Sequence, residues 1–468
     1  MCGGPGLPAE LYGGGDALLK GAETMDLAVA FIVFIVSMVG AIFLDISMLL
    51  ALFIGLAAFL FVGVHRGFSP GNLLHMGFEA VKESMGVIEV MLIIGFITAT
   101  WRISGTITIF VYYGIQVITP PLFLMVTFLL SCLLSYALGT SFGVAGTVGV
   151  IFMALARSGG VDPVIAGGVI MSGIYFGDRC SPVSSSANMI AGITGTEIYD
   201  NVKLMVRTAL LPMGITLAAY GVLSAANPIK QVDEALVRSF EESFSLSLWA
   251  FVPAILMLLL PLLRVKVRSA MAASIISGVL VAWLVQGVPL FEIAKTCVLG
   301  YRAQGDGLGT ILNGGGLVSM LEVAGILVLS STYSGIFSGT DMLRQLQDML
   351  GRACTRLGRF SVMVLVSTAM AVIFCNQTIS TLMCSDLLKQ PYAAGGGSKE
   401  ELAQDMENSV ILIACLIPWS IGCSVPLSFL GAGYNSLPYA VYMYAVPICY
   451  WFTKRRWFGS DRGLSAAS

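Results

Sequence analysis

The chain has 468 residues, of which 57% are hydrophobic and 11% are charged, and its mean hydropathy is +0.88. Soluble proteins carry about 25% charged residues, so this composition excludes an ordinary soluble domain and predicts an all-α polytopic membrane protein. The net charge of −2 argues against nucleic acid as a partner.

Several apolar runs approach the roughly 20 residues that a helix needs to cross a bilayer. They are 27–44, 49–64, 122–138, 204–223, 246–263, 270–285, 317–337, 360–374 and 434–452. Other runs are shorter or are interrupted by glycine. We therefore expect about 11 to 14 spanning or half-spanning helices.

The first part of the chain combines a polar tail with a first span. Residues 1–24 are rich in glycine and predict a flexible tail, and the run 27–44 is too long for the core of a signal peptide. Residues 72–89 are amphipathic and predict an interfacial helix leading into a short intramembrane helix over 90–100. The polar residues from Trp101 to Thr106 should end that helix before a second helical stretch.

Residues 138–150 place four glycines and three hydroxyl side chains in an apolar context of membrane length. Such a pattern has two interpretations. Small residues allow helices to pack closely in a membrane. Alternatively, the segment is unwound, and its carbonyls and hydroxyls face a cavity. The sequence leaves both interpretations open.

The stretch 173–191 is the most informative one. The apolar run 164–176 stops at Gly177-Asp178-Arg179, and Pro182 prevents simple continuation of a helix. Four serines and Asn188 follow. Charge and irregular backbone at membrane depth are tolerated where they are buried in protein or line a wet cavity, so we expect one half of a transport site here. A structural ion pair between Asp178 and Arg179 is the alternative role for that carboxylate.

A polar connector over 228–243 divides the chain into a first half, 25–227, and a second half, 244–453, followed by a basic tail over 454–468. The second half has its own polar interruptions at 311–320, 374–383 and 406–423. Interrupted hydrophobic segments at corresponding places in two halves indicate a transporter site. We therefore expect 140–147, 177–188, 376–381 and 407–418 to lie close together near the bilayer midplane.

Three basic clusters predict the orientation of the chain. They are Arg264 with Lys266 and Arg268, then Arg344, Arg352, Arg356 and Arg359, and finally Lys454, Arg455 and Arg456. By the positive-inside rule these clusters and the C-terminus face the cytoplasm of a cell membrane. Residues 341–357 predict a cytoplasmic amphipathic helix.

The interrupted segments contain recognisable motifs. These are Gly139-Thr140-Ser141-Phe142, Gly146-Thr147-Val148-Gly149, Tyr175-Phe176-Gly177-Asp178-Arg179 with Ser181-Pro182-Val183-Ser184, Leu416-Ile417-Pro418-Trp419 and, more weakly, Trp101 with Ser104-Gly105-Thr106. They resemble motifs of the NhaC family of sodium/proton antiporters, in the wider ion-transporter superfamily. The resemblance implies two inverted-topology repeats with broken helices and re-entrant hairpins, and a site at the midplane that works by alternating access.

The chain departs from that family at three acidic positions. The departures are Ser185 after the Ser-Pro-Val-Ser motif, Asn376 before Gln377, and Asn408 between Glu407 and Ser409. Each replaces a carboxylate by a neutral group. A sodium/proton exchanger needs carboxylates that trade a proton for a hard cation, and Asp178, Glu322 and Glu407 are the acids that remain.

The resemblance and the interruptions together give a set of candidate site residues. The candidates for binding the ion or substrate are Thr140, Ser141, Thr147, Asp178, Ser181, Ser184, Ser185, Asn188, Asn376, Gln377, Thr378, Glu407, Asn408 and Ser409. The candidates for proton coupling are Asp178, Glu322 and Glu407. No cofactor and no metal other than transported Na⁺ are expected. The expected partners are a small ion or solute and membrane lipid, with a homodimer as one allowed assembly.

Sodium/proton antiport is the leading functional hypothesis. The alternative is proton- or sodium-coupled transport of a small organic solute, such as a carboxylate or an amino acid, because the neutral substitutions suit directional hydrogen bonds to such groups. An intramembrane enzyme is a third hypothesis, suggested by the serines at 181–186. It is disfavoured because both histidines, His65 and His75, fall near the far end of the second run and cannot serve as a base there.

Overall fold

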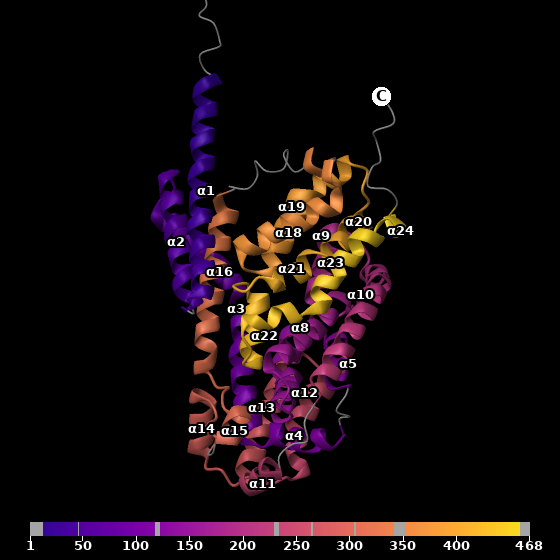
Figure 1. Cartoon of the computed structure of the whole chain (residues 1–468). Coiled ribbons are helices and arrows are strands. Elements are labelled where there is room, and N and C mark those ends of the chain that lie inside the picture. The colour runs from indigo at the N-terminus through magenta and orange to yellow at the C-terminus, as the bar shows by residue number, and fades with distance from the viewer. Residues whose placement is uncertain are drawn as a thin grey trace, which may run out of the picture. The chain divides into compact units, whose positions relative to one another are not determined.

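The computed structural model describes residues 13–44, 46–117, 122–228, 234–263, 265–303, 306–340, 352–354 and 356–458 (Figure 1). Contacts between residues divide the chain into two compact units. Unit 1 comprises Met1–Ser84 with Gly325–Met342, and unit 2 comprises Met85–Ala324 with Leu343–Ser468. These units differ from the two halves that the connector at 228–243 suggests, because unit 1 joins the beginning of the chain to a helix far along it.

Unit 1 consists of α1 (Gly13–Phe43), α2 (Met48–His65), the beginning of α3 (Pro70–Ile103) and most of α16 (Leu321–Thr340). Its core is aromatic: the ring of Tyr333 packs edge-on against Phe34 and Phe59, at 5.5 and 5.6 Å between centroids. Edge-to-face packing of this kind stabilises apolar cores beyond the area that it buries. The Tyr333 hydroxyl donates to the backbone oxygen of Leu52, which fixes α16 against α2.

One expectation for the first part of the chain needs correction. Helix α1 begins at Gly13, and residues 1–12 lie outside the described residues, so the flexible tail over 1–24 stays a prediction. Helix α3 is continuous over Pro70–Ile103 and is not divided into an interfacial and an intramembrane helix. It ends where expected, because Gly105 has a left-handed φ of +75°. Beyond it α4 (Thr106–Val117) is bent by 64° from the last part of α3.

Unit 2 holds the remaining helices. They are α4, α5 (Phe123–Leu138), α6 (Ser141–Val144), the π-helix η3 (Ala145–Gly149), α7 (Val150–Ser158), α8 (Pro163–Cys180), α9 (Ser185–Thr194), α10 (Ile198–Ala226), α11 (Glu234–Ser243), η4 (Leu248–Phe251), α12 (Val252–Leu262), α13 (Val267–Leu284), α14 (Leu290–Leu299), α15 (Asp306–Leu312), η5 (Val318–Met320), α18 (Arg359–Phe374), α19 (Gln377–Ala394), α20 (Lys399–Glu407), α21 (Val410–Ile413), η7 (Ala414–Leu416), α22 (Ile421–Leu430), η8 (Tyr434–Tyr439), α23 (Val441–Thr453) and α24 (Arg455–Phe458). Helix α11 occupies most of the predicted polar connector.

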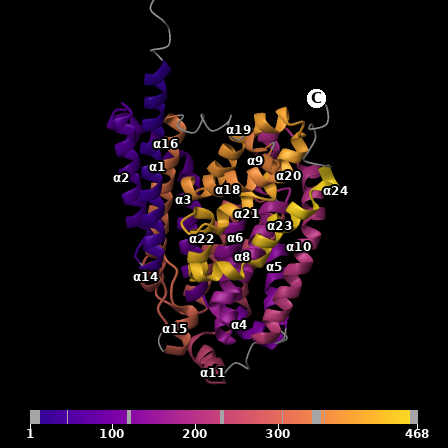
Figure 2. The ribbon, with the colours of Figure 1, turned by 45° about the horizontal axis from the view of Figure 1, so that its top comes forward.

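The central contact of unit 2 is the crossing of α5 and α8, which run side by side in both views (Figures 1 and 2). Gly173 and Gly177 allow the close approach. A Cβ atom on Gly177 would overlap with the backbone of Ser135, and one on Gly173 would overlap with the side chain of Ser131. Small residues at helix crossings are typical of membrane proteins, where packing replaces the hydrophobic driving force.

The apolar helices identify a polytopic membrane protein with an all-α fold. Among the described residues, Met48–His65, Ser141–Ser158, Ile198–Ala226 and Val267–Leu284 are long and apolar enough to cross a membrane. Two bent pairs, Ile88–Ile103 with Thr106–Gly114 and Lys399–Leu416 with Ile421–Leu430, raise these 4 spans to 6. Shorter apolar helices lie at Val29–Phe43, Phe123–Leu138, Leu248–Pro261, Val318–Tyr333 and Arg359–Phe374. Spans, bent pairs and shorter apolar helices together make 11 segments among the described residues (4 + 2 + 5), within the 11 to 14 spanning or half-spanning helices expected.

An internal repeat relates two parts of unit 2. Gly139 ends α5 with φ 64° and ψ 26°, and Cys375 ends α18 with φ 55° and ψ 10°. The next residues, Thr140 and Asn376, are both extended and both cap the following helix. The offset in residue number is 236 (376 − 140), and it also relates the left-handed glycines Gly195 and Gly431.

The same offset relates the two proline breaks. Ser181 and Ile417 have φ −83° and ψ of 133° and 118°, each is followed by proline, and each break ends at a serine, Ser184 or Ser420. A residue before proline is driven into this extended region, so the two X-Pro-X-Ser sequences impose one backbone path. The two halves thus share their chain breaks over 139–195 and 375–431. The inverted topology of the repeats stays a prediction.

Two of the residues assigned to basic clusters are buried in unit 2. Arg359 makes two hydrogen bonds to the Glu401 carboxylate, at 2.9 and 3.0 Å, and Lys454 Nζ lies 2.7 Å from Glu401 and 2.6 Å from Asp405. We call these four residues the buried ion cluster. Arg264, Arg344 and most of the predicted helix at 341–357 lie outside the described residues.

Candidate functional site

Four chain interruptions within unit 2 form the candidate site. The first lies at Gly139 and Thr140, the second at 181–184, the third at Cys375 and Asn376, and the fourth at 417–420. Each has a local cause: a left-handed residue ends the helix at the first and third, and proline ends it at the second and fourth. A serine, threonine or asparagine then stands at the start of the next helix, as is typical of N-caps.

The first interruption contacts the second, the third contacts the fourth, and a further residue connects these two pairs. A Cβ atom on Gly139 would lie 2.6 Å from Val183 Cγ2, so the first break packs on the second. The backbone nitrogen of Ile421 donates to Cys375 O at 2.8 Å, which joins the third break to the fourth. Gln377 connects the pairs, because its Nε2 donates to Asp178 at 3.0 Å and to Ile411 O at 2.9 Å. The stretches that we expected to converge therefore do meet.

Asp178 lies in the last turn of α8 and is 4% exposed. Its carboxylate accepts hydrogen bonds from Ser184 Oγ at 3.4 Å, from Ser186 Oγ at 3.2 Å to each oxygen, and from Gln377. These donors come from α9, from its N-cap residue and from α19, so the carboxylate is hydrogen-bonded by both halves of the chain. Hydrogen bonds from several donors stabilise the charged form of a buried carboxylate.

Arg179 is fully buried beside Asp178 but points elsewhere. Its guanidinium donates to Asn408 Oδ1 at 2.6 Å, to Thr208 Oγ1 at 2.8 Å and to the Tyr442 hydroxyl at 3.1 Å. Among the described residues no ion pair joins it to Asp178. The alternative of a structural pair between these neighbours is therefore wrong, because consecutive residues on a helix do not face each other.

Glu407 ends α20 and is 0% exposed. Both of its carboxylate oxygens lack a hydrogen-bond partner among the described residues. The charges that act on it come from Arg179 and Asp178 on α8. A buried carboxylate without partners is costly, and in membrane proteins such groups are characteristic of functional sites.

The other candidates separate into buried and exposed side chains. Ser141, Thr147, Ser181, Asn408 and Ser409 are buried, and Thr140 and Asn376 serve as helix caps. Thr147 donates to Gly143 O, Ser181 to Tyr136 O and Ser409 to Asp405 O. The protons of these three hydroxyls are therefore engaged in hydrogen bonds to backbone oxygens. Ser185, Asn188, Thr378 and Glu322 are exposed. Exposure separates Glu322, a proton-coupling candidate, from the buried carboxylates.

The segment over 138–150 is mostly helical. Its interruption is confined to Gly139 and Thr140, and a π-helix follows at Ala145–Gly149. Gly146 contacts Ile94, and Gly149 contacts Leu430. Of the two interpretations left open, close packing through small residues describes this segment beyond its first two residues. The π-helix is itself a feature that often accompanies functional sites.

Ser186 was not among the candidates, although it bridges both oxygens of Asp178. The sequence offers several serines in one run and does not show which of them turns inward. Gln404 was also missed: its Nε2 donates to Asn201 O at 3.0 Å, and its Oε1 is buried without a donor among the described residues. It lies one helical turn before Glu407, on the same face of α20.

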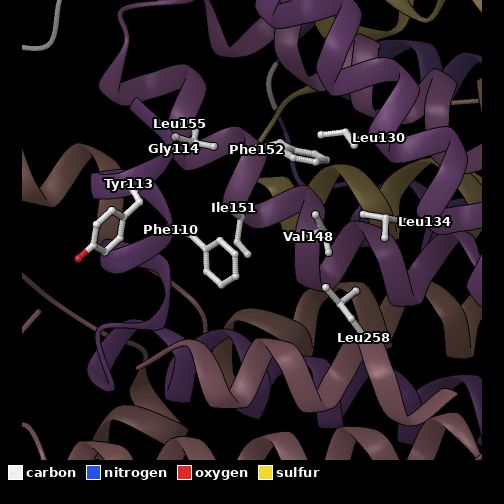
Figure 3. Close-up of a pocket in the computed structure, with 10 residues that line it drawn as sticks. All are labelled: Phe110, Tyr113, Gly114, Leu130, Leu134, Val148, Ile151, Phe152, Leu155 and Leu258. Carbon is white, nitrogen blue, oxygen red and sulfur yellow. The ribbon is translucent and has the colours of Figure 1, made fainter. Parts of the chain in front are cut away.

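Two cavities lie elsewhere in unit 2. A pocket of about 340 Å³ is lined by apolar side chains such as Phe110, Val148 and Leu258 (Figure 3). Its lining contains no acid, amide or base, so it does not suit an ion. A cavity of about 820 Å³ is lined by charges of both signs, including Glu242 and Arg302.

Comparisons with known proteins agree with this architecture. Residues 173–453 match the Na⁺/H⁺ antiporter family. The chain is 26% identical over 394 residues to the Na⁺/H⁺ antiporter NhaC of Alkalihalophilus pseudofirmus, covering 81% of this chain and 85% of the relative. It is 24% identical over 386 residues to the malate-2H⁺/Na⁺-lactate antiporter of Bacillus subtilis, covering 81% and 82%.

A further relative is the arginine/ornithine antiporter ArcD of Halobacterium salinarum, which is 24% identical over 423 residues, covering 86% of this chain and 85% of the relative. The family match covers more than half of the chain and runs from Gly173, inside α8, to the end of α23, which includes both proline breaks. The relatives are named as antiporters. The chain therefore belongs to the Na⁺/H⁺ antiporter family and is a secondary transporter, not an enzyme.

Proposed function

We propose that this protein exchanges Na⁺ for H⁺ across a cell membrane by alternating access. The observation that carries the proposal is the presence of two buried carboxylates, Asp178 and Glu407, at broken helices from the two halves of the chain. Carboxylates at membrane depth are characteristic of ion and proton pathways. Family membership supports the same exchange.

The surroundings of Asp178 suit a hard cation. Such cations prefer oxygen ligands, and the hydroxyls of Ser184 and Ser186 lie against the carboxylate. The two halves also interrupt their helices at equivalent positions. Such broken helices in two repeats are typical of transporters in which one repeat rocks against the other.

Transport of an organic solute is the second candidate. Two relatives are named for exchange of malate and lactate or of arginine and ornithine. The observation that favours it is Arg179, a buried guanidinium whose hydrogen-bond acceptors among the described residues are all neutral. Guanidinium groups bind carboxylates in bidentate fashion, so a substrate carboxylate would find a partner there if the guanidinium left Asn408.

Dissipation of a pH gradient in proteoliposomes tests the first candidate against the second. We expect NaCl to collapse the gradient, as reported by a pH-sensitive dye, and we expect Asp178→Asn to abolish the response with the protein still folded. The order of the two candidates would be reversed if NaCl did not dissipate the pH gradient with the wild-type protein over a wide range of pH, and if the protein took up a labelled carboxylate or amino acid. Loss of folding in Asp178→Asn would make Asp178 a structural residue.

We also propose that the basic loops and the C-terminus face the cytoplasm. Lys266, Arg268, Arg455 and Arg456 are exposed, as the positive-inside rule requires of the residues that set orientation. A cysteine introduced at Arg456→Cys should escape a membrane-impermeant maleimide in intact cells and react after lysis. Labelling of intact cells would contradict this orientation. Assembly as a homodimer and contacts with specific lipids stay predictions.

A further inference from the structure

Asp178 and Glu407 are both buried, but their surroundings differ. The oxygens of Asp178 accept hydrogen bonds from two serines and Gln377. The oxygens of Glu407 accept none from the described residues. Donors stabilise an ionised carboxylate, whereas an anion without donors is expensive to keep away from water. The surroundings of Asp178 therefore favour its ionised form, and those of Glu407 favour its protonated form in this conformation.

Gln404 provides a further buried polar atom without a hydrogen-bond partner among the described residues, on the same helix as Glu407. A protonated carboxyl group offers an O–H donor. Gln404 Oε1, one turn earlier on the same face of α20, is a buried acceptor that lacks a donor among the described residues. Elsewhere on this helix, Glu401 and Asp405 are held by Arg359 and Lys454 in the buried ion cluster.

Arg179 supplies the charge that allows the proton to leave. Its guanidinium donates to the oxygens of Asn408, Thr208 and Tyr442, and no carboxylate among the described residues accepts a hydrogen bond from it. Glu407 directly precedes Asn408 and lies in the field of Arg179, with Asp178 as the opposing charge. An ionised Glu407 would therefore appear beside a cation that is already in place.

We propose that Glu407 is the proton carrier, that Asp178 is the cation ligand, and that Arg179 is a positioning residue whose fixed charge lets Glu407 ionise. The inference rests on the proposed Na⁺/H⁺ exchange. One Na⁺ binds at the Asp178 carboxylate as one proton leaves a carboxyl oxygen of Glu407. The site carries no net charge before this step, with Asp178 and Arg179 balanced. It carries none afterwards, because Na⁺ offsets the charge on Glu407.

Two assays on purified protein in proteoliposomes separate the roles. Counterflow of ²²Na⁺ against internal Na⁺ at equal pH requires cation binding and conformational exchange but no net proton movement. Uptake of ²²Na⁺ driven by a pH gradient requires the proton carrier as well. We expect Glu407→Gln to retain counterflow and to lose gradient-driven uptake. We expect Asp178→Asn to lose both.

Additional variants keep the test decisive. Glu407→Met removes the carboxyl group with a similar volume and covers the case in which the glutamine variant does not fold. Glu407→Asp should restore part of the gradient-driven uptake. Arg179→Gln should keep counterflow and shift the pH dependence of gradient-driven uptake to higher pH, which a merely structural role would not do. Glu79→Gln, an exposed carboxylate on α3, should leave both assays unchanged.

The outcomes distinguish this inference from the proposed function. If Glu407→Gln and Glu407→Met still couple sodium uptake to the pH gradient, Glu407 is not the carrier, while sodium/proton exchange stands. If Asp178→Asn keeps counterflow, the cation ligand lies elsewhere and the inference is wrong. If the wild-type protein shows neither activity with sodium, the proposed function fails, and this inference fails with it.

Discussion

Ser186 donates to both oxygens of Asp178, whereas its neighbour Ser185 is exposed. A hydrogen bond to a charged group contributes about 1.5–3 kcal/mol, and 1.4 kcal/mol corresponds to a factor of ten in affinity. Ser186→Ala should therefore raise the sodium concentration for half-maximal exchange by about tenfold or more. Ser185→Ala is the matched control and should change it little. Equal effects of both substitutions would show that the hydroxyl on Asp178 does not contribute to binding.

Residue types alone predicted part of the site. Asp178, Ser184 and Gln377 were expected near one another, and their side chains do meet. The selection of Ser186 over Ser185 could not be predicted, because it depends on the rotation of α9 after Pro182. That rotation is set where Ser184 caps the helix.

The partners of Arg179 also lie beyond what the sequence indicates. Its acceptors belong to residues as distant as Asn408 and Tyr442, which only the packed helices bring together. The sequence places Asp178 beside it, but the side chains of adjacent helical residues diverge by about 100°. Contacts across the two halves, such as this one, are therefore a property of the fold.

At the level of elements, the crossing of α5 and α8 holds Asp178 in place. Because a Cβ atom on Gly177 would meet the backbone of Ser135, the helices would have to separate to accommodate it. Gly177→Ala should therefore lower the thermal midpoint in detergent and reduce exchange. Gly192→Ala is a matched control on α9, where a Cβ atom would meet nothing within 4 Å. Similar midpoints for the two variants would contradict this account of the crossing.

The boundaries of elements were predicted best where a residue forces them. Pro182 and Pro418 end helices as expected, and Gly105 ends α3. The charged part of α3 does not interrupt the helix, because a helix continues through a change of polarity when nothing in its backbone stops it. Cys375 in the left-handed region was also unexpected. Its position becomes intelligible only from its repeat partner Gly139.

At the scale of the whole molecule, the buried ion cluster is a group of charged residues whose burial could not be predicted from the sequence. Arg359 and Lys454 looked like members of solvated clusters, yet both are buried with Glu401. Removal of one member of a buried ion pair costs about 3–5 kcal/mol. Glu401→Gln should therefore lower the thermal midpoint clearly. Glu292→Gln breaks the exposed pair with Lys295 and should have little effect. A stable Glu401→Gln protein would show that the cluster is not needed for the fold.

The buried charges also set how exchange responds to a membrane potential. In the described residues the buried charged side chains are Arg102, Asp178, Arg179, Arg359, Glu401, Asp405, Glu407 and Lys454. The members of the buried ion cluster are held to one another and to neighbouring hydroxyls, and we expect their charges to stay constant during a cycle. Under our inference Glu407 alone changes its charge, and it does so as Na⁺ arrives.

The resulting prediction is that exchange is electroneutral. The carrier has the same net charge with a proton on Glu407 as with Na⁺ at Asp178, and a membrane potential does work only on charge that moves, at about 2.3 kcal/mol per elementary charge per 100 mV. Sodium-driven proton movement in proteoliposomes should therefore proceed at the same rate when potassium and valinomycin clamp the potential at zero, inside positive or inside negative. Empty liposomes under the same clamps provide the control for leak. A rate that rises with one sign of the potential and falls with the other would mean that unequal numbers of protons and sodium ions move in each cycle. If protons are in excess, a second group besides Glu407 must carry a proton.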